Sequence, residues 1–165
     1  MKKLILRTLT AFLLTGLASA MADPAGSETP TLIALVHRSN MTQDLTVTEL
    51  RRFLLGEVPA WPDKTPVIVV LVQPDTPVLR RAFERLLGIS LIEYQKQYLV
   101  AGYRGNHGPK IRMVTSGQAA RQAVASNRGA IAVLAFDPIW RTTGAHPTKL
   151  LRINGKEPGE PGYVW

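Results

Sequence analysis

The sequence predicts an α/β fold in which a largely parallel sheet is covered by helices on both faces. Helical and strand-like patterns alternate along the chain from about residue 32 onward. Most of the expected strands are continuous apolar runs rather than alternating ones, which indicates burial on both faces. Helical segments, in turn, open with residues typical of helix caps. This alternation is typical of a sheet enclosed between two helical layers.

Residues 1–22 have the layout of a cleavable secretory signal peptide. A basic start is followed by the mostly apolar segment 9–17, which is shorter than the roughly 20 residues that span a membrane. Small residues then offer cleavage after Ala20 or Ala22. We therefore expect export from a bacterial cytoplasm, a periplasmic location and no transmembrane segment after cleavage.

The rest of the chain divides into three parts. Residues 23–31 are polar with Pro and Gly and predict a flexible leader. Residues 32–154 contain the periodic segments and are long enough for one domain with a core. Residues 155–165 are rich in Pro and Gly and predict an irregular tail.

The first half of the domain predicts a buried strand at 32–37, a loop at 39–45 and a helix from Thr46 to about Leu55. Thr46 and Glu49 have the spacing of a capping box, and Gly56 is placed to end the helix. At helical spacing the apolar residues of this segment share one face, and its two arginines point outward. Trp61 lies between prolines and is expected to plug a loop over the core.

A second buried strand is expected at 67–72, followed by a helix that Asp75 or Thr76 caps and Gly88 ends. The later segments are expected to be a helix at 90–100 with a capping box, a loop at 103–110, a strand at 111–115, a helix at 116–126, a strand at 130–136 and a short strand at 150–153.

The net charge of +8 is distributed unevenly. The signal segment carries three basic residues and no acids, so the remainder is +5. Between Tyr94 and Lys156 there are ten Lys or Arg and a single acid, Asp137. Such a field attracts anions or anionic surfaces, although a solvated basic face is the simpler explanation.

Composition and motifs exclude several classes of function. The absence of cysteine excludes disulfides, a lipoprotein anchor, a thiolate metal site and a cysteine nucleophile. The three histidines are scattered, and HExxH, GxSxG, GxGxxG and Walker motifs are absent. We therefore expect no metal, no cofactor and no enzymatic activity, and the expected periplasmic location argues against a nucleic-acid partner.

Two candidate binding segments follow strands at the carboxyl edge of the expected sheet. Ligands favour this edge in open α/β sheets, because backbone amides and helix dipoles at helix N-termini attract anions. Ordinary helix capping is the alternative explanation for both segments. The candidate residues are Gln73, Asp75, Thr76 and Arg80 in the first segment, and Thr115 and Ser116 in the second.

Four segments in the same order resemble the phosphate-type substrate-binding proteins of ABC transporters. Leu50–Gly56 followed by Trp61 resembles the family's LRxIFxG…W segment. Arg80–Phe83 is similar to its REAF helix, Gly129–Ile131 to its PGAIGY strand, and Ser116–Ala125 to the helix before that strand. The resemblance covers about residues 32–154.

The resemblance implies a type II periplasmic-binding-protein-like fold, of which this chain has one lobe's worth of sequence, similar to the second lobe. The family's phosphate-binding run, Arg-x-Asp-Gly-Ser-Gly-Thr, aligns with residues 73–79. Only Asp75 matches; Gln73 replaces the Arg, and Pro77 and Leu79 replace the hydroxyl residues. High-affinity phosphate binding is therefore not expected.

The expected function is a non-enzymatic, substrate-binding-like protein of the periplasm. Its ligand would be a small solute, such as a weakly held anion, or a protein partner covering the same face; a homodimer that rebuilds a two-lobed cleft is a variant. The alternative is an envelope-interaction module that uses the basic 94–156 surface on an anionic partner.

Overall fold

The computed structural model describes residues 31–73, 76–103, 110–137, 140 and 146–163, with the backbone alone for 99–103. The expected signal peptide, most of the leader and most of the 103–110 loop lie outside these residues. The helices are α1 (Val47–Leu54), α2 (Pro77–Leu87), α3 (Leu91–Tyr103) and α4 (Gly117–Ala125). The strands are β1 (Leu32–His37), β2 (Asp44–Leu45), β3 (Ile68–Val72), β4 (Lys110–Val114), β5 (Ala130–Ala135), β6 (Thr148–Leu150) and β7 (Arg152–Ile153).

The central sheet has five strands in the order β4-β3-β5-β1-β6. β3 pairs in parallel with both β4 and β5. β1 is antiparallel to both of its neighbours, β5 and β6. Strands β3, β4, β5 and β6 therefore run in one direction and β1 alone runs against them, so the expectation of a mostly parallel sheet is confirmed with β1 as the exception. The apolar run of β1 reports that both faces are covered, but it carries no information on strand direction.

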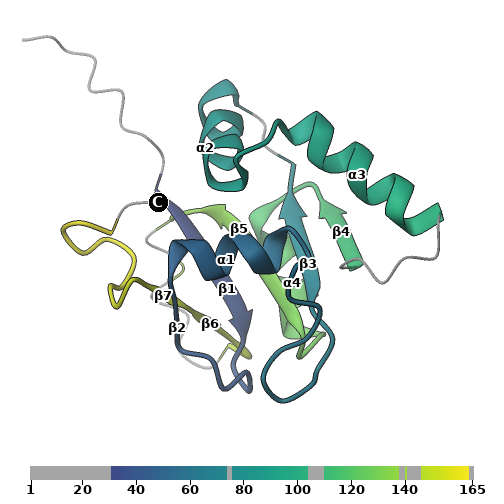
Figure 1. Ribbon diagram of the computed structural model, residues 1–165. Coiled ribbons are helices and arrows are strands. Elements are labelled where there is room, and N and C mark those ends of the chain that lie inside the picture. Colours follow the sequence, from purple (N-terminus) through teal and green to yellow (C-terminus); the bar gives the residue numbers. More distant parts are fainter. Residues whose placement is uncertain (1–30, 74–75, 104–109, 138–139, 141–145, 164–165) are drawn as a thin grey trace, which may run out of the picture.

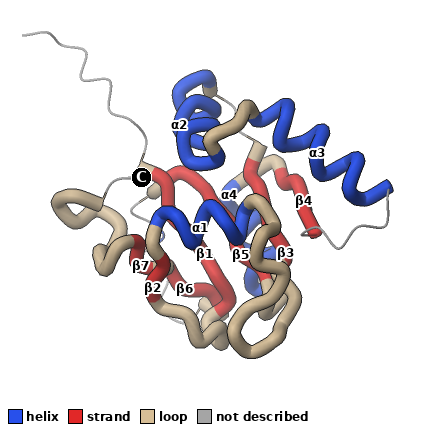
Figure 2. Tube along the Cα trace, viewed as in Figure 1, coloured by secondary structure: helices blue, strands red, loops and turns tan. Residues whose placement is uncertain are grey.

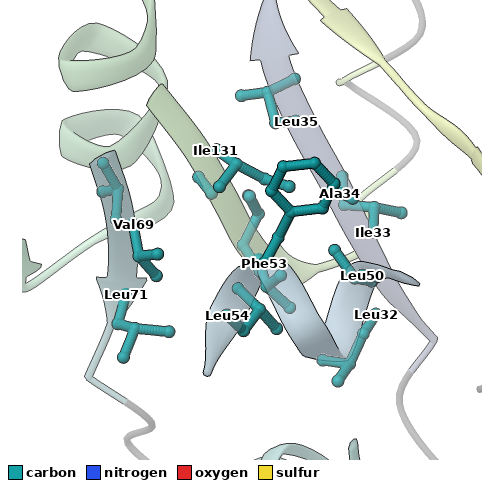
Figure 3. Close-up of a cluster of buried hydrophobic side chains, with 14 of the residues drawn as sticks. Leu32, Ile33, Ala34, Leu35, Leu50, Phe53, Leu54, Val69, Leu71 and Ile131 are labelled. Carbon is teal, nitrogen blue, oxygen red and sulfur yellow. The ribbon is translucent and has the colours of Figure 1, made fainter. Parts of the chain in front are cut away.

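Helices cover both faces of this sheet, as the sequence predicts. Figure 1 shows α1 in front of the sheet and α4 behind it, with α2 and α3 beyond the end of β3. The buried face of α1 consists of Leu50, Phe53 and Leu54. Figure 3 shows these side chains over strand residues such as Val69, Leu71 and Ile131, while Arg51 and Arg52 remain exposed.

The opposite layer is built from small side chains. The buried residues of α4 are Ala120, Ala123 and Val124, and β5 presents Ala130 and Ala132, which are fully buried. α4 lies across β5 and also contacts β1 and β3. Small residues on both sides allow this helix to approach the sheet closely.

The predicted helix caps are present. Thr46 and Glu49 form both halves of the capping box, and the Thr46 hydroxyl accepts from the Glu49 amide at 3.1 Å. Thr76 rather than Asp75 caps α2, and Gly88 ends it with a φ of 72°. Ser90 Oγ accepts from the Glu93 amide, and α3 extends to Tyr103, beyond the expected end.

Trp61 covers the core from its loop, as predicted. Its ring is 3% exposed and stacks on Phe53 with a centroid separation of 4.5 Å. Its Nε1 donates to the carbonyl of Gly129 at 2.9 Å, which ties the 58–66 loop to the start of β5.

The C-terminal region differs from the prediction. The single strand expected at 150–153 is two short strands: β6 pairs with β1, and β7 pairs in parallel with β2. The expected loop at 39–45 accordingly contains β2. Strands of two or three residues are too short to show a periodic pattern, so sequence reasoning missed them. The 155–163 segment forms turns, seen at the left of Figure 2.

Candidate binding site

The two predicted binding segments lie at the same edge of the sheet. Because β3 and β4 are parallel and in register, their carboxyl ends at Val72 and Val114 are adjacent. The Gln73 amide donates to the Val114 carbonyl at 2.9 Å and joins the two segments. The structure therefore brings Gln73 beside the end of β4, whereas Thr76 and Ser116 cap the two helices that follow these strands. Asp75 lies outside the described residues.

The helices that follow these segments leave toward opposite faces of the sheet. α2 follows β3 on the face covered by α1, whereas α4 follows β4 behind the sheet (Figure 1). A crevice at the carboxyl ends of neighbouring strands, where the connections diverge, is the usual ligand position in α/β sheets.

The two hydroxyl residues of this edge are helix caps. Thr76 Oγ1 accepts from the Leu79 amide at 3.2 Å, and Ser116 Oγ accepts from the Ala119 amide at 3.1 Å. A hydroxyl that accepts in this way still has its O–H to donate to an anion. Capping, the simpler explanation, is therefore confirmed, and it leaves each hydroxyl one donor.

The first turn of α2 offers fewer backbone donors than a phosphate site of the resembled type. Pro77 occupies the first turn and has no amide N–H. The Leu79 amide is taken by Thr76, so Val78 supplies the remaining early donor. Arg80 follows on an exposed turn, and the Gln73 side chain is exposed as well. These groups face solvent, where the attraction between charges is weak.

Trp140 lies over the first turn of α4, a position that sequence reasoning missed. A Cβ on Gly117 would be 3.0 Å from the Trp140 ring, so glycine is what allows this contact. Arg121 lies over the same ring, 5.5 Å from its centroid. Burial and the nearby Arg121 charge lower the pKa of His146 below its ordinary value. Gly117 and Trp140 are 23 positions apart, so no local pattern in the sequence indicated this contact.

A concave region lies along β6 and β7 and extends to Trp140, which contacts the first turn of α4. This groove encloses about 810 Å³ between β6–β7 and the turn 157–161, with Arg38, Gln43 and Trp140 also lining it. Lys149 donates to the Asn40 carbonyl, and Arg152 pairs with Glu157 at 3.5 Å. Burial lowers the pKa of Lys149. Because two of its cationic groups have protein partners and two glutamates line it, the groove is a poor oxyanion site.

The basic residues of the 94–156 segment that the structure describes lie on different parts of the molecule. Lys110 and Arg112 lie on β4, whereas Lys149 lies on β6, and these strands are opposite edges of the sheet. Lys156 donates to a carbonyl of its own turn. The single basic surface expected from the sequence is therefore split between different parts of the fold.

Within the described ranges, no three metal-binding side chains (His, Cys, Asp or Glu) cluster together. The same part of the chain contains no helix with the length and apolar character of a membrane span.

Comparison with known proteins gives matches among solved structures alone: no protein-family model and no curated protein sequence matches the chain. An ABC-type phosphate transport receptor from Vibrio cholerae superposes with a TM-score of 0.55 at 18% identity, over 78% of this chain and 48% of that one. PstS from Borrelia burgdorferi gives 0.56 at 11% identity, over 78% and 49%.

A phosphate ABC transporter substrate-binding protein from Clostridium perfringens, solved with bound phosphate, gives 0.57 at 16% identity, over 78% and 47%. The chain has the periplasmic-binding-protein-like fold. It spans about half the length of these structures, and at such identities the similarity concerns the fold alone.

Proposed function

We propose that this chain is an exported, non-catalytic, substrate-binding-like protein of the periplasm that holds a small oxyanion weakly. The proposed site consists of Gln73, Thr76 and Arg80 after β3, and Thr115 and Ser116 after β4, with Asp75 expected beside them. The observation that carries the proposal is the junction of the two segments through the Gln73 amide and the Val114 carbonyl.

The chemistry of this edge supports binding rather than catalysis. Its described groups are hydroxyls, backbone amides, a carboxamide and a guanidinium, all of which donate hydrogen bonds to an anion. The fold supports the proposal too, because this edge is where α/β sheets of this type hold ligands.

Weak affinity follows from the loop. A charge-assisted hydrogen bond contributes about 1.5–3 kcal/mol when it is well formed, and Gln73, Pro77 and Leu79 remove such partners. An exposed Arg80 adds little in water. We therefore expect a dissociation constant for phosphate of about 1 mM or weaker.

The test is an NMR titration of the protein with phosphate, with sulfate as a second oxyanion. Saturable shifts are expected at the amides of Val78, Gly117 and Gln118. R80E, which places a carboxylate beside the anion, should weaken them, whereas R128E, an equal charge change at an exposed residue after α4, should not.

Isothermal titration calorimetry with phosphate can contradict the proposal. Micromolar or tighter phosphate binding would show that the altered loop still forms a high-affinity site. Shifts confined to the β6–β7 groove would move the site there.

A further inference from the structure

The outer face of α2 carries a row of arginines that the proposed site does not use. Arg81 and Arg85 are one helical turn apart and exposed, on the side opposite the buried Leu79, Phe83 and Leu86. Arg51 of α1 reaches the end of this row, because a Cβ on Gly88 would overlap its guanidinium. These three arginines, termed the arginine face, extend along about 10 Å of helix axis, from Arg81 to the Gly88 end.

The charge of the arginine face is not neutralised by the protein. None of the three arginines forms an ion pair within the described ranges, where the pairs are Arg52–Glu57 and Arg152–Glu157. The single acid of α2 is Glu84, and its Oε1 accepts from the Leu91 amide at the start of α3. Three guanidiniums so close together, on a chain of net charge +8, attract an anionic partner.

One exposed apolar side chain flanks the arginine face, and a second is exposed on the next helix. Val78, one turn before Arg81 on the same side of α2, is 44% exposed. Ile92, in the first turn of α3, is 65% exposed. Basic side chains beside single apolar ones suit the interfacial region of a bilayer, where charges meet headgroups and apolar groups enter the acyl boundary.

We propose that the arginine face binds the surface of an anionic phospholipid bilayer. The face is the convex outer side of a helix at one end of the fold (Figure 2), and the β6–β7 groove lies elsewhere. A broad anionic surface requires no shape complementarity, whereas a protein partner usually anchors its side chains in pockets. The inference does not depend on the proposed solute site, since that site uses the Val78 backbone amide and Arg80, whereas the arginine face uses the side chains of Arg51, Arg81 and Arg85.

The test measures co-sedimentation of the purified protein with vesicles of phosphatidylcholine, with and without about one-third phosphatidylglycerol. Binding is expected to the anionic vesicles alone and to fall steeply from low to physiological ionic strength. Each basic residue near such a surface contributes about a fivefold change in partitioning, so R81E/R85E should lower partitioning at least about 25-fold.

The matched control is K110E/R112E, which makes the same charge change at the exposed edge strand β4. It should retain most of the binding, and R81K/R85K should bind nearly as well as the unaltered protein, since the charge is kept. Circular dichroism verifies that each variant is folded. Equal losses in the two reversal variants, or no binding to anionic vesicles, would overturn the proposal. Binding to poly-glutamate but not to vesicles, lost in R81E/R85E alone, would assign the face to an acidic protein instead.

Discussion

The indole nitrogens of Trp61 and Trp140 have different environments. Trp61 Nε1 donates to the buried carbonyl of Gly129, directly before β5. Trp140 Nε1 is buried without a hydrogen-bond partner in the described part of the chain. A buried donor without an acceptor contributes nothing to stability and costs its desolvation.

This difference predicts unequal effects of the same substitution. W61F should lower the free energy of unfolding by at least about 1 kcal/mol more than W140F, because it leaves the Gly129 carbonyl unpaired in the core. Urea denaturation of the two variants gives the comparison. Equal losses would contradict the role of the Trp61 hydrogen bond.

Two of the candidate ligand residues, Thr76 and Ser116, also have roles that depend on their local environment. Thr76 and Ser116 were identifiable because cap residues and anion-binding residues share the same positions at helix starts. Their capping contacts are confirmed, whereas a ligand role remains a prediction that the phosphate titration tests.

At the scale of elements, α3 is attached to the end of α1 by two tyrosines. The hydroxyls of Tyr94 and Tyr98 both donate to the Leu54 carbonyl, at 2.7 and 3.2 Å. Burial raises the pKa of Tyr94, and burial also raises the pKa of Tyr98 to about 12. Both therefore remain protonated donors at physiological pH.

Two donors on one carbonyl predict non-additive substitutions. Y98F should cost less than about 0.5 kcal/mol, because Tyr94 still satisfies the carbonyl. Y94F should cost about 1 kcal/mol, and the double variant more than the sum by about 0.5 kcal/mol or more, since the Leu54 carbonyl is then unpaired. A double-mutant cycle from urea denaturation measures the coupling; strict additivity would refute it.

The start of α1 predicts a dependence of stability on pH. Hydrogen bonds from the Thr46 backbone and hydroxyl hold the pKa of Glu49 below its ordinary value of 4.5. Folding therefore gains from this group above pH 4.5, and the gain is lost as the pH falls through the lowered pKa.

E49Q should consequently show a smaller loss of Tm than the unaltered protein when the pH is lowered from 6 toward 3. Thermal melts by circular dichroism at the two pH values provide the measurement, with E93Q as the matched control on α3. Parallel Tm curves for E49Q and the unaltered protein would show that the capping box does not titrate as described.

At the scale of the whole molecule, the close packing of α4 on the sheet depends on small residues beneath the helix. Ala132 is fully buried and pairs in register with Leu35 on one side and Val70 on the other. It shares its sheet face with Leu134, which lies close to Gly117 of α4.

A132L should therefore force α4 away from the sheet and cost about 1–3 kcal/mol of unfolding free energy. A125L, at a half-exposed position of α4, is the control and should cost little. Unchanged stability of A132L in guanidinium denaturation would argue against close packing of α4 on β5.

The sequence by itself determined the local features of this protein: the helix caps, the buried face of α1, the burial of β1, β3 and β5, and the glycine at the end of α2. Each depends on a few neighbouring residues. Their spacing predicts which side chain caps which amide and which side chains share a buried face. The position of the carboxyl ends of β3 and β4 at one edge of the sheet was predictable as well. Helical segments connect these strands, and such connections make parallel pairing the simplest arrangement.

Only the tertiary structure decided the antiparallel direction of β1, the separation of β6 from β7, the position of Trp140 over α4, and the meeting of Arg51 with α2. All four result from contacts between residues far apart in the chain. Apolar runs and charge counts record how deeply a segment is buried or how basic it is, but they do not record which distant segment lies beside it.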